Sequence, residues 1–240
     1  MNQIETQMNK LRLMGMAKTW TALQEARKLH ELSFNEGMEL LLQAEEEERD
    51  NRRFKRLEYQ AGFRYKASLE EVRLDDTTRG IDKSLITNLA TGSFISKGES
   101  VLITGATGCG KSFLASALGH QACLLGFKVA YFNMQKLLLK TKMARLEGTI
   151  YKFFEKLAKT NLLILDDFGL THLDKQQQMD FMEMIEDRHG RSSTIIASQL
   201  PVVSWYDVIG EETIADAILD RLVHASYRVE IKGESLRKKQ

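Results

Sequence analysis

The chain has 240 residues, 43% hydrophobic and 28% charged, which suits one medium-sized domain with its own core plus a small appendage. Its formal net charge of +1 creates no strong overall field toward nucleic acid, so any DNA-binding surface must be a local patch. Two cysteines without a CxxC pair argue against a zinc site or a disulfide framework. The chain has no signal-peptide pattern and no apolar run near the roughly 18 residues of a membrane span, so we expect a cytoplasmic protein without membrane contact.

Residues 1–68 are predicted to form a small all-α domain, because apolar residues recur at helical spacing and Gly and Pro are nearly absent. Ser33 and Glu36 have the spacing of a capping box at the start of one helix. Further along this helix an acidic run precedes a basic run, and Glu45 with Arg49 is one of its i,i+4 pairs. This domain would serve self-association, DNA binding or partner binding.

The basic run of that helix has two interpretations. It is a solvated face braced by its own ion pairs, or it contacts DNA. The second interpretation rests on aromatic residues between the cations, such as Phe54 and Tyr59, which suit stacking or wedging beside phosphate contacts. The candidate DNA contacts here are Arg52, Arg53, Lys55 and Arg56.

Residues 69–99 are expected to form a linker that leads into a second domain, residues 100–240, in which strands alternate with helices. Strands are expected at 101–104, 128–133, 162–166, 194–198 and 227–231. Helices are expected at 111–125, 149–159, 175–189 and 213–224. A further helix is expected to follow strand 128–133 and to end at residue 145. This alternation predicts an α/β fold with a parallel sheet covered by helices on both faces.

The segment GATGCGKS lies between a predicted strand and a predicted helix, which is the context of a phosphate-binding loop. Its glycines let backbone N–H groups face inward at a helix N-terminus. Lys111 can reach the β- and γ-phosphates, and the Ser112 hydroxyl can coordinate Mg²⁺. The segment therefore predicts binding of a nucleoside triphosphate with Mg²⁺. Its residues are Gly105, Ala106, Thr107, Gly108, Cys109, Gly110, Lys111 and Ser112.

Two acids, Asp166 and Asp167, end a strand of four apolar residues, at the edge where α/β sheets bind ligands. Asp166 is expected to hold Mg²⁺ beside Ser112, and Asp167 to polarise a water that attacks the γ-phosphate. A further strand stands in the sequence between the phosphate loop and this acidic pair. The acidic strand therefore need not be the immediate neighbour of the loop strand, as in NTPases that activate water with an acidic residue.

Other polar residues are candidates for sensing or stabilising the reacting phosphate. Ser198 or Gln199, at the end of the next strand, could sense hydrolysis. Arg221 could act as an arginine finger across a subunit boundary, or it could be a surface residue paired with Asp216 or Asp220. The helix after strand 128–133 carries a basic stripe that could contact DNA phosphates, although an ordinary solvated face would look the same. That stripe consists of Lys136, Lys140, Lys142 and Arg145.

The segments GATGCGKS, LLILDDFG, TIIASQLPVVSWYDVIG, TIADAILDRLVH and GESLRK together resemble the IstB-like ATPases. These are AAA+ proteins encoded by insertion sequences and related to the helicase loader DnaC and the initiator DnaA. The resemblance covers essentially the whole chain. It implies that the loop is Walker A and the acidic pair Walker B, with Ser198 or Gln199 as sensor 1 and Arg221 as the arginine finger.

The resemblance implies a helper of transposition that assembles with ATP on duplex DNA as a ring or spiral, largely independent of sequence, and recruits and stimulates the transposase of the same element. Asp167 replaces the usual glutamate, so slow hydrolysis is expected. Because the sequence stops soon after Arg237, we expect no C-terminal lid, and Arg237 would be only a weak substitute for the sensor 2 arginine that such a lid carries. Two alternatives are a DnaC-like loader of a replicative helicase and a small-molecule phosphotransferase. The latter would need an arginine-rich lid, for which no segment is a candidate.

Overall fold

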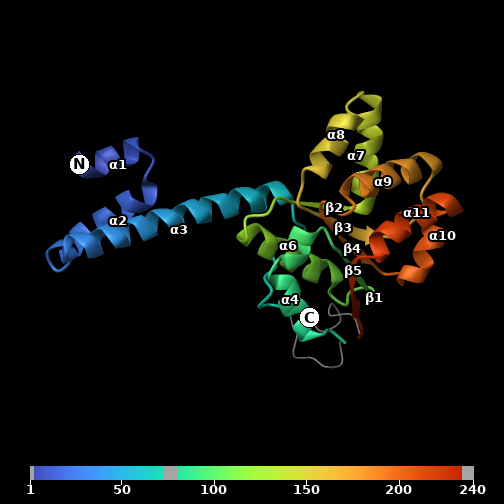
Figure 1. Ribbon diagram of the computed structural model, residues 1–240, viewed down its shortest axis with the longest axis horizontal. Coiled ribbons are helices and arrows are strands. Elements are labelled where there is room, and N and C mark those ends of the chain that lie inside the picture. Colours follow the sequence, from blue (N-terminus) through green and yellow to red (C-terminus); the bar gives the residue numbers. More distant parts are fainter. Residues whose placement is uncertain (1–2, 73–79, 234–240) are drawn as a thin grey trace. The chain divides into compact units, whose positions relative to one another are not determined.

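Helix α3 (Phe34–Ala61) carries the chain from an N-terminal unit, residues 1–56, into a second unit, residues 57–240 (Figure 1). The computed structural model describes residues 3–72 and 80–233. Within these two ranges no helix combines the length and the apolar character needed to cross a bilayer. Arg237 lies outside the described residues.

The N-terminal unit is helical, as predicted. Its elements are α1 (Gln3–Lys10), α2 (Met14–Glu25), the 3-10 turn η1 (Lys28–His30) and the first part of α3. The predicted capping box is present at the start of α3. The Ser33 backbone N–H donates to the Glu36 carboxylate over 2.8 Å, and the Glu36 N–H donates back to the Ser33 hydroxyl over 3.3 Å.

Helices α2 and α3 meet at a buried glutamate. The Glu45 carboxylate accepts hydrogen bonds from the backbone N–H groups of Gly15 at 2.8 Å and Met16 at 3.4 Å, and from Arg49 Nε at 2.7 Å. A Cβ atom on Gly15 would lie 2.2 Å from the Ala44 carbonyl oxygen, so only glycine allows this approach. The carboxylate thus satisfies donors at the start of α2 that have no partner within the helix.

The second unit is built on five strands joined by helices. The strands are β1 (Ser100–Gly105), β2 (Val129–Asn133), β3 (Leu162–Phe168), β4 (Ser193–Ser198) and β5 (Ser226–Ile231). The α-helices are α4 (Lys83–Ala90), α5 (Ser93–Lys97), α6 (Lys111–Leu124), α7 (Met134–Leu146), α8 (Ile150–Ala158), α9 (Lys175–Arg188), α10 (Trp205–Ile209) and α11 (Glu212–Val223). A 3-10 turn, η3 (Val202–Ser204), precedes α10.

All strand pairs of the sheet are parallel, and the strand order is β2-β3-β4-β1-β5. Strand β4 therefore separates the loop strand β1 from the acidic strand β3. This confirms the predicted α/β fold and the prediction that the acidic strand need not be the immediate neighbour of the loop strand. The expected linker differs from the structure, because it contains two helices, α4 and α5. Asp82 caps α4 by accepting a hydrogen bond from the N–H of Ser84.

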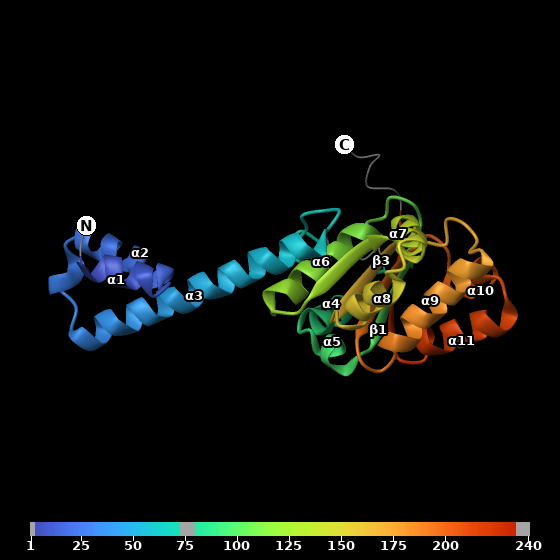
Figure 2. The ribbon, with the colours of Figure 1, turned by 90° about the horizontal axis from the view of Figure 1, so that it is seen from above.

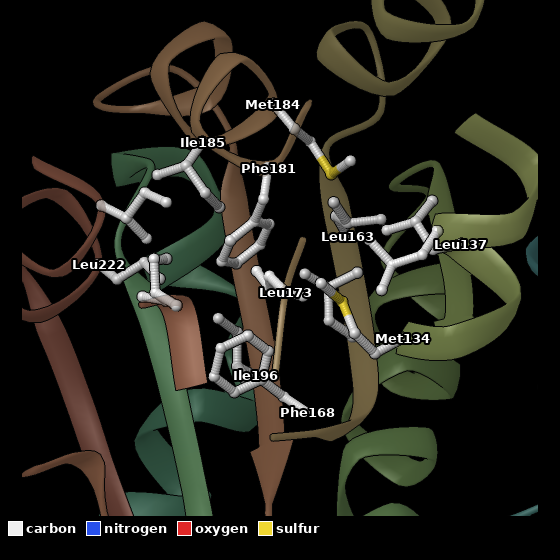
Figure 3. Close-up of a cluster of buried hydrophobic side chains, with 14 of the residues drawn as sticks. Met134, Leu137, Leu163, Phe168, Leu173, Phe181, Met184, Ile185, Ile196 and Leu222 are labelled. Carbon is white, nitrogen blue, oxygen red and sulfur yellow. The ribbon is translucent and has the colours of Figure 1, made fainter. Parts of the chain in front are cut away.

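The two faces of strand β3, which lies between β2 and β4, pack on different helices. Leu163 and Leu165 belong to a buried cluster with side chains from α7 to α11, part of which Figure 3 shows. Ile164 faces the opposite way, onto α6, where a Cβ on Gly119 would lie 2.7 Å from Ile164 Cδ1. Since the strand is buried on both sides, helices cover both faces of the sheet. On the face that carries Leu163 and Leu165, α9 and α11 lie side by side (Figure 2).

Candidate nucleotide site

The phosphate-binding loop joins β1 to α6, as the sequence predicts. Three of its glycines have positive φ angles: Gly105 at 148°, Gly108 at 79° and Gly110 at 104°. These values lie in or near a region that side chains with a Cβ rarely adopt, so the path of the loop depends on glycine. Helix α6 then begins at Lys111. The free N–H groups of its first turn therefore point toward the loop.

The Lys111 ammonium lies at the loop, because Nζ donates to the Ala106 carbonyl oxygen over 2.8 Å. Cys109, also in the loop, is buried and forms no disulfide. The second cysteine, Cys123, lies in α6, and burial together with the nearby Glu58 charge raises the pKa of its thiol to about 12. Neither thiol is therefore placed as a nucleophile.

The buried carboxylate of Asp166 meets the loop directly. The Ser112 hydroxyl donates to Asp166 Oδ1 over 2.8 Å, and the N–H of Asp167 donates to the same oxygen over 3.0 Å. The other oxygen, Oδ2, accepts a hydrogen bond from the Tyr131 hydroxyl on β2. Burial and this bond to Asp166 raise the pKa of Tyr131, so its hydroxyl stays protonated and acts as the donor.

Asp167 sits at an irregularity in the sheet, where the register between β3 and β4 shifts between Leu165 and Phe168. Its φ of 58° is left-handed, a conformation that aspartate tolerates better than most residues with a Cβ. Irregularities of this kind re-aim side chains beside functional sites. Here the turn leaves the Asp167 side chain 22% exposed, whereas that of Asp166 is 1% exposed.

Two residues that the sequence did not single out hold Asp167. Asn133 Nδ2, at the end of β2, donates to Asp167 Oδ2 over 2.9 Å, and Arg64 Nη1 donates to the same oxygen over 3.1 Å. Arg64 Nη1 also lies 3.7 Å from Asp166 Oδ2. Asn133 could have been suspected as a polar residue at the carboxyl end of a strand, but no motif marks Arg64 or Tyr131.

A cavity of about 480 Å³ opens between the loop and the acidic pair, within the size range of small-molecule sites. Its lining comes from the loop, the start of α6, the ends of β3 and β4, and the segment after α3. The lining residues are Arg64, Tyr65, Thr107, Gly108, Gly110, Lys111, Ser112, Phe113, Asp167, Leu170 and Gln199.

The two sensor candidates differ in their surroundings. Gln199 lines this cavity and accepts a hydrogen bond from the Thr107 hydroxyl over 2.7 Å. Ser198 is buried, donates to the Phe168 carbonyl over 2.8 Å and accepts from the Leu200 N–H over 3.1 Å. Ser198 therefore supports the turn after β4, and Gln199 is the residue that faces the cavity.

Arg221 does not line the nucleotide cavity of its own chain. It lies on α11, donates to the Ala217 carbonyl over 2.8 Å, and forms an ion pair with Glu186 of α9. The sequence offered Asp216 or Asp220 as its partner, and the structure instead supplies a carboxylate from the neighbouring helix.

The candidate DNA-contacting cations fall into distinct environments. Arg145 is paired within the chain, because its Nε donates over 2.8 Å to Asp180, a buried carboxylate on α9. Lys142 is exposed on α7. Lys136 and Lys140 line a groove of about 1,200 Å³ beside β2.

On α3, Arg52 lies 3.7 Å from both Glu45 and Glu48, which fits the interpretation of a face braced by its own ion pairs. Arg53, Lys55 and Arg56 have exposed side chains.

A model of the IstB-like ATP-binding protein family matches residues 6–240. The chain belongs to this family. It is 42% identical over 234 residues to an insertion sequence ATP-binding protein of Sinorhizobium fredii, covering 97% of this chain and 95% of that protein. It is also 30% identical over 241 residues to the ATP-binding protein of insertion sequence IS21 of Pseudomonas aeruginosa, covering 100% of this chain and 90% of that one.

The fold of this IstB-like protein is also found in solved structures. The DnaC helicase loader matches with a TM-score of 0.53 and 23% identity, over 62% of this chain and 87% of that one. DnaI matches with a TM-score of 0.56 and 21% identity, over 70% of this chain and 92% of that one. The expected AAA+ P-loop fold, with DnaC among its structural neighbours, is thus confirmed.

Proposed function

We propose that this IstB-like protein hydrolyses ATP, assembles with ATP on duplex DNA, and recruits and stimulates the transposase of its insertion sequence. The observation that carries the ATPase part is the contact of 2.8 Å between the Ser112 hydroxyl and Asp166 Oδ1. It brings together two oxygen donors of the kind that Mg²⁺ prefers, beside a loop built for phosphates. The relatives' names, which specify ATP binding and insertion sequences, support the same proposal.

Five side chains at this site have a role in the proposed hydrolysis: those of Lys111, Ser112, Asp166, Asp167 and Gln199. The loop amides and Lys111 bind the β- and γ-phosphates, while Ser112 and Asp166 hold the metal ion. Mg²⁺, when bound, neutralises charge on these phosphates. Asp167 orients a water and accepts its proton as the water oxygen bonds to the γ-phosphorus and the bond to the ADP oxygen breaks. Gln199, which faces the cavity, is placed to sense whether the γ-phosphate is present.

The rate is expected to be low in the isolated chain. The aspartate carboxylate reaches one methylene less far than a glutamate would, and Asn133 and Arg64 both occupy Asp167 Oδ2. Arg221, which does not line the cavity of its own chain, would act on the nucleotide of a neighbouring subunit after leaving Glu186. Assembly would then stimulate turnover, and ATP would stabilise the interface until it is hydrolysed.

The groove beside β2 supports the proposal of DNA binding. Its walls come from α7, α8 and the segment after α3, and Phe132 and Phe153 contribute aromatic surface. Its lysines are Lys128, Lys136, Lys140, Lys152, Lys156 and Lys159. Lysines contact phosphates as point charges without reading bases, which agrees with assembly on duplex DNA that is largely independent of sequence.

Analytical sedimentation of the full chain tests this function. The conditions are ATP or ADP, each with duplex DNA, single-stranded DNA or no DNA, and Lys111→Ala serves as the variant without a phosphate-binding ammonium. We expect a large assembly with wild-type protein, ATP and duplex DNA together, and none with the variant. Preference for single strands, with capture of a replicative helicase by the N-terminal helices, would favour the helicase-loader alternative.

A further inference from the structure

The segment after α3 reaches into the nucleotide site. Phe63 anchors it: the ring stacks on His120 with 4.8 Å between centroids and packs edge-on against Tyr131 at 6.2 Å. Gly119 makes room for this ring, because a Cβ there would lie 2.5 Å from Phe63 Cε1. The following residues, Arg64 and Tyr65, line the cavity of the phosphate loop.

Arg64 is the cation that faces the acidic pair. Its guanidinium donates from Nη1 to Asp167 Oδ2 and remains 44% exposed, with its central carbon 5.3 Å from the centre of the Tyr65 ring. Among the described residues that line the cavity, the charged ones are Arg64, Lys111 and Asp167. A guanidinium has five N–H donors in a planar fork that matches phosphate oxygens, and both acidic contacts here use one nitrogen.

We propose that Arg64 is a γ-phosphate-binding residue that acts within its own chain and exchanges the Asp167 carboxylate for the γ-phosphate when ATP binds. This inference rests on the proposed ATP site. The Arg64 guanidinium lies 3.7 Å from Asp166, so its contact with the acids would weaken once Ser112 and Asp166 held a metal ion, because like charges repel. The γ-phosphate provides a stronger set of acceptors in the same cavity.

The exchange has a consequence for the reaction. Arg64 and Asn133 donate to the same oxygen of Asp167, so departure of Arg64 frees acceptor capacity on the carboxylate that polarises water. With ADP there is no γ-phosphate to hold Arg64, and the guanidinium returns to Asp167. The contacts of the segment from Gly62 to Tyr65, which directly follows α3, therefore differ between the ATP-bound and the ADP-bound protein.

Isothermal titration of the full chain with two nucleotides tests the proposal. The probes are the β,γ-methylene analogue of ATP, which cannot be hydrolysed, and ADP, both with Mg²⁺. The variants are Arg64→Ala, Arg64→Lys, which keeps the charge without the fork, and Lys66→Ala, an exposed cation in the same segment, as the matched control. Protein concentrations are kept where sedimentation shows single chains.

For Arg64→Ala we expect the affinity for the ATP analogue to fall by about 10- to 100-fold, the effect of losing a hydrogen bond to a charged group, while ADP affinity stays within about twofold. Arg64→Lys should lose less, and Lys66→Ala should lose nothing. Equal losses for both nucleotides, tighter binding of the analogue, or a loss seen only in assemblies would overturn the proposal. Failure of the wild-type chain to bind either nucleotide would instead refute the ATP site itself.

Discussion

The side chain of Asn133 both caps α7 and donates a hydrogen bond to Asp167. Its side-chain oxygen caps α7 by accepting from the N–H groups of Gln135 and Lys136, while its Nδ2 donates to Asp167 Oδ2 over 2.9 Å. The end of β2, the start of α7 and the proposed water-activating carboxylate are therefore fixed by one amide group. Asn133 is a positioning residue, because it acts through Asp167.

Two substitutions separate these tasks. Asn133→Ser keeps a capping oxygen but loses the amide donor, whereas Asn133→Ala loses both. We expect both variants to lower the rate of ATP hydrolysis by about tenfold, in line with the loss of one hydrogen bond to a charged group. Only Asn133→Ala should also lose about 1 kcal/mol of stability, the usual contribution of an N-cap. Normal hydrolysis by Asn133→Ser would show that Asp167 does not need this bond.

The groove lysines should affect DNA binding alone. Lys136→Ala and Lys140→Ala are expected to weaken binding of duplex DNA at all sequences, and each should reduce the slope of log affinity against log salt by about 1. Fluorescence anisotropy over a range of salt concentrations measures both quantities. Lys97→Ala, on α5, is the control and should change neither. An unchanged salt slope in both groove variants would place the DNA contact elsewhere.

Arg145 should behave differently from the lysines near it, because it compensates a buried charge. Its removal leaves Asp180, whose side chain is 3% exposed, with Gln176 as a neutral donor. We expect Arg145→Ala to destabilise the second unit by about 2–4 kcal/mol, somewhat less than for a fully buried pair, because the Arg145 side chain is 35% exposed. Lys142→Ala, on the exposed face of the same helix, should change stability by less than about 0.5 kcal/mol. Thermal unfolding distinguishes the two, and equal stability of both variants would refute the role of the pair.

The buried Glu45 should make the N-terminal unit sensitive to acid. Burial raises the pKa of Glu45, but the bonds from Arg49, Gly15 and Met16 lower it by more, so the folded pKa lies below the ordinary value of 4.5. A depressed carboxyl pKa contributes stability above the unfolded pKa, and this contribution is lost as pH falls through the folded pKa.

Glu45→Gln tests this contribution. Hydrogen exchange at the Gly15 and Met16 amides should show protection lower by the equivalent of about 1–2 kcal/mol in the variant at pH 6. The difference between the two proteins should shrink as pH falls below about 4.5. A difference that is constant across this range would mean that the charge of Glu45 makes no contribution.

The parts of the site that were predictable are local in sequence. The loop is one continuous motif, and the acids follow an apolar strand, so strand–loop–helix context was enough to place both at the same edge of the sheet. The contacts that complete the site are not local. Arg64 and Asp167 are 103 residues apart, and the packing of Phe63 against α6 and β2 holds the segment that carries Arg64 beside Asp167.

For the basic stripe on α7, the sequence predicted the helix but not the partners of its side chains. Periodicity correctly placed Lys136 and Arg145 on one helix, but it could not show that α9 presents Asp180 to one of them. Helix α4 was missed for a related reason: eight residues are too few for a clear periodic pattern, and the helix depends on its Asp82 cap and on burial of Ile86 and Leu89.

The most direct test of the central claim compares binding and turnover of ATP in Asp167→Asn. Titration calorimetry with the non-hydrolysable analogue reports binding, and phosphate release with and without duplex DNA reports turnover. The account predicts that the variant binds the analogue and assembles on duplex DNA, while phosphate release falls by at least about 100-fold, as for loss of a general base. Phosphate release at the wild-type rate would contradict the assignment of Asp167 and, with it, the proposed mechanism.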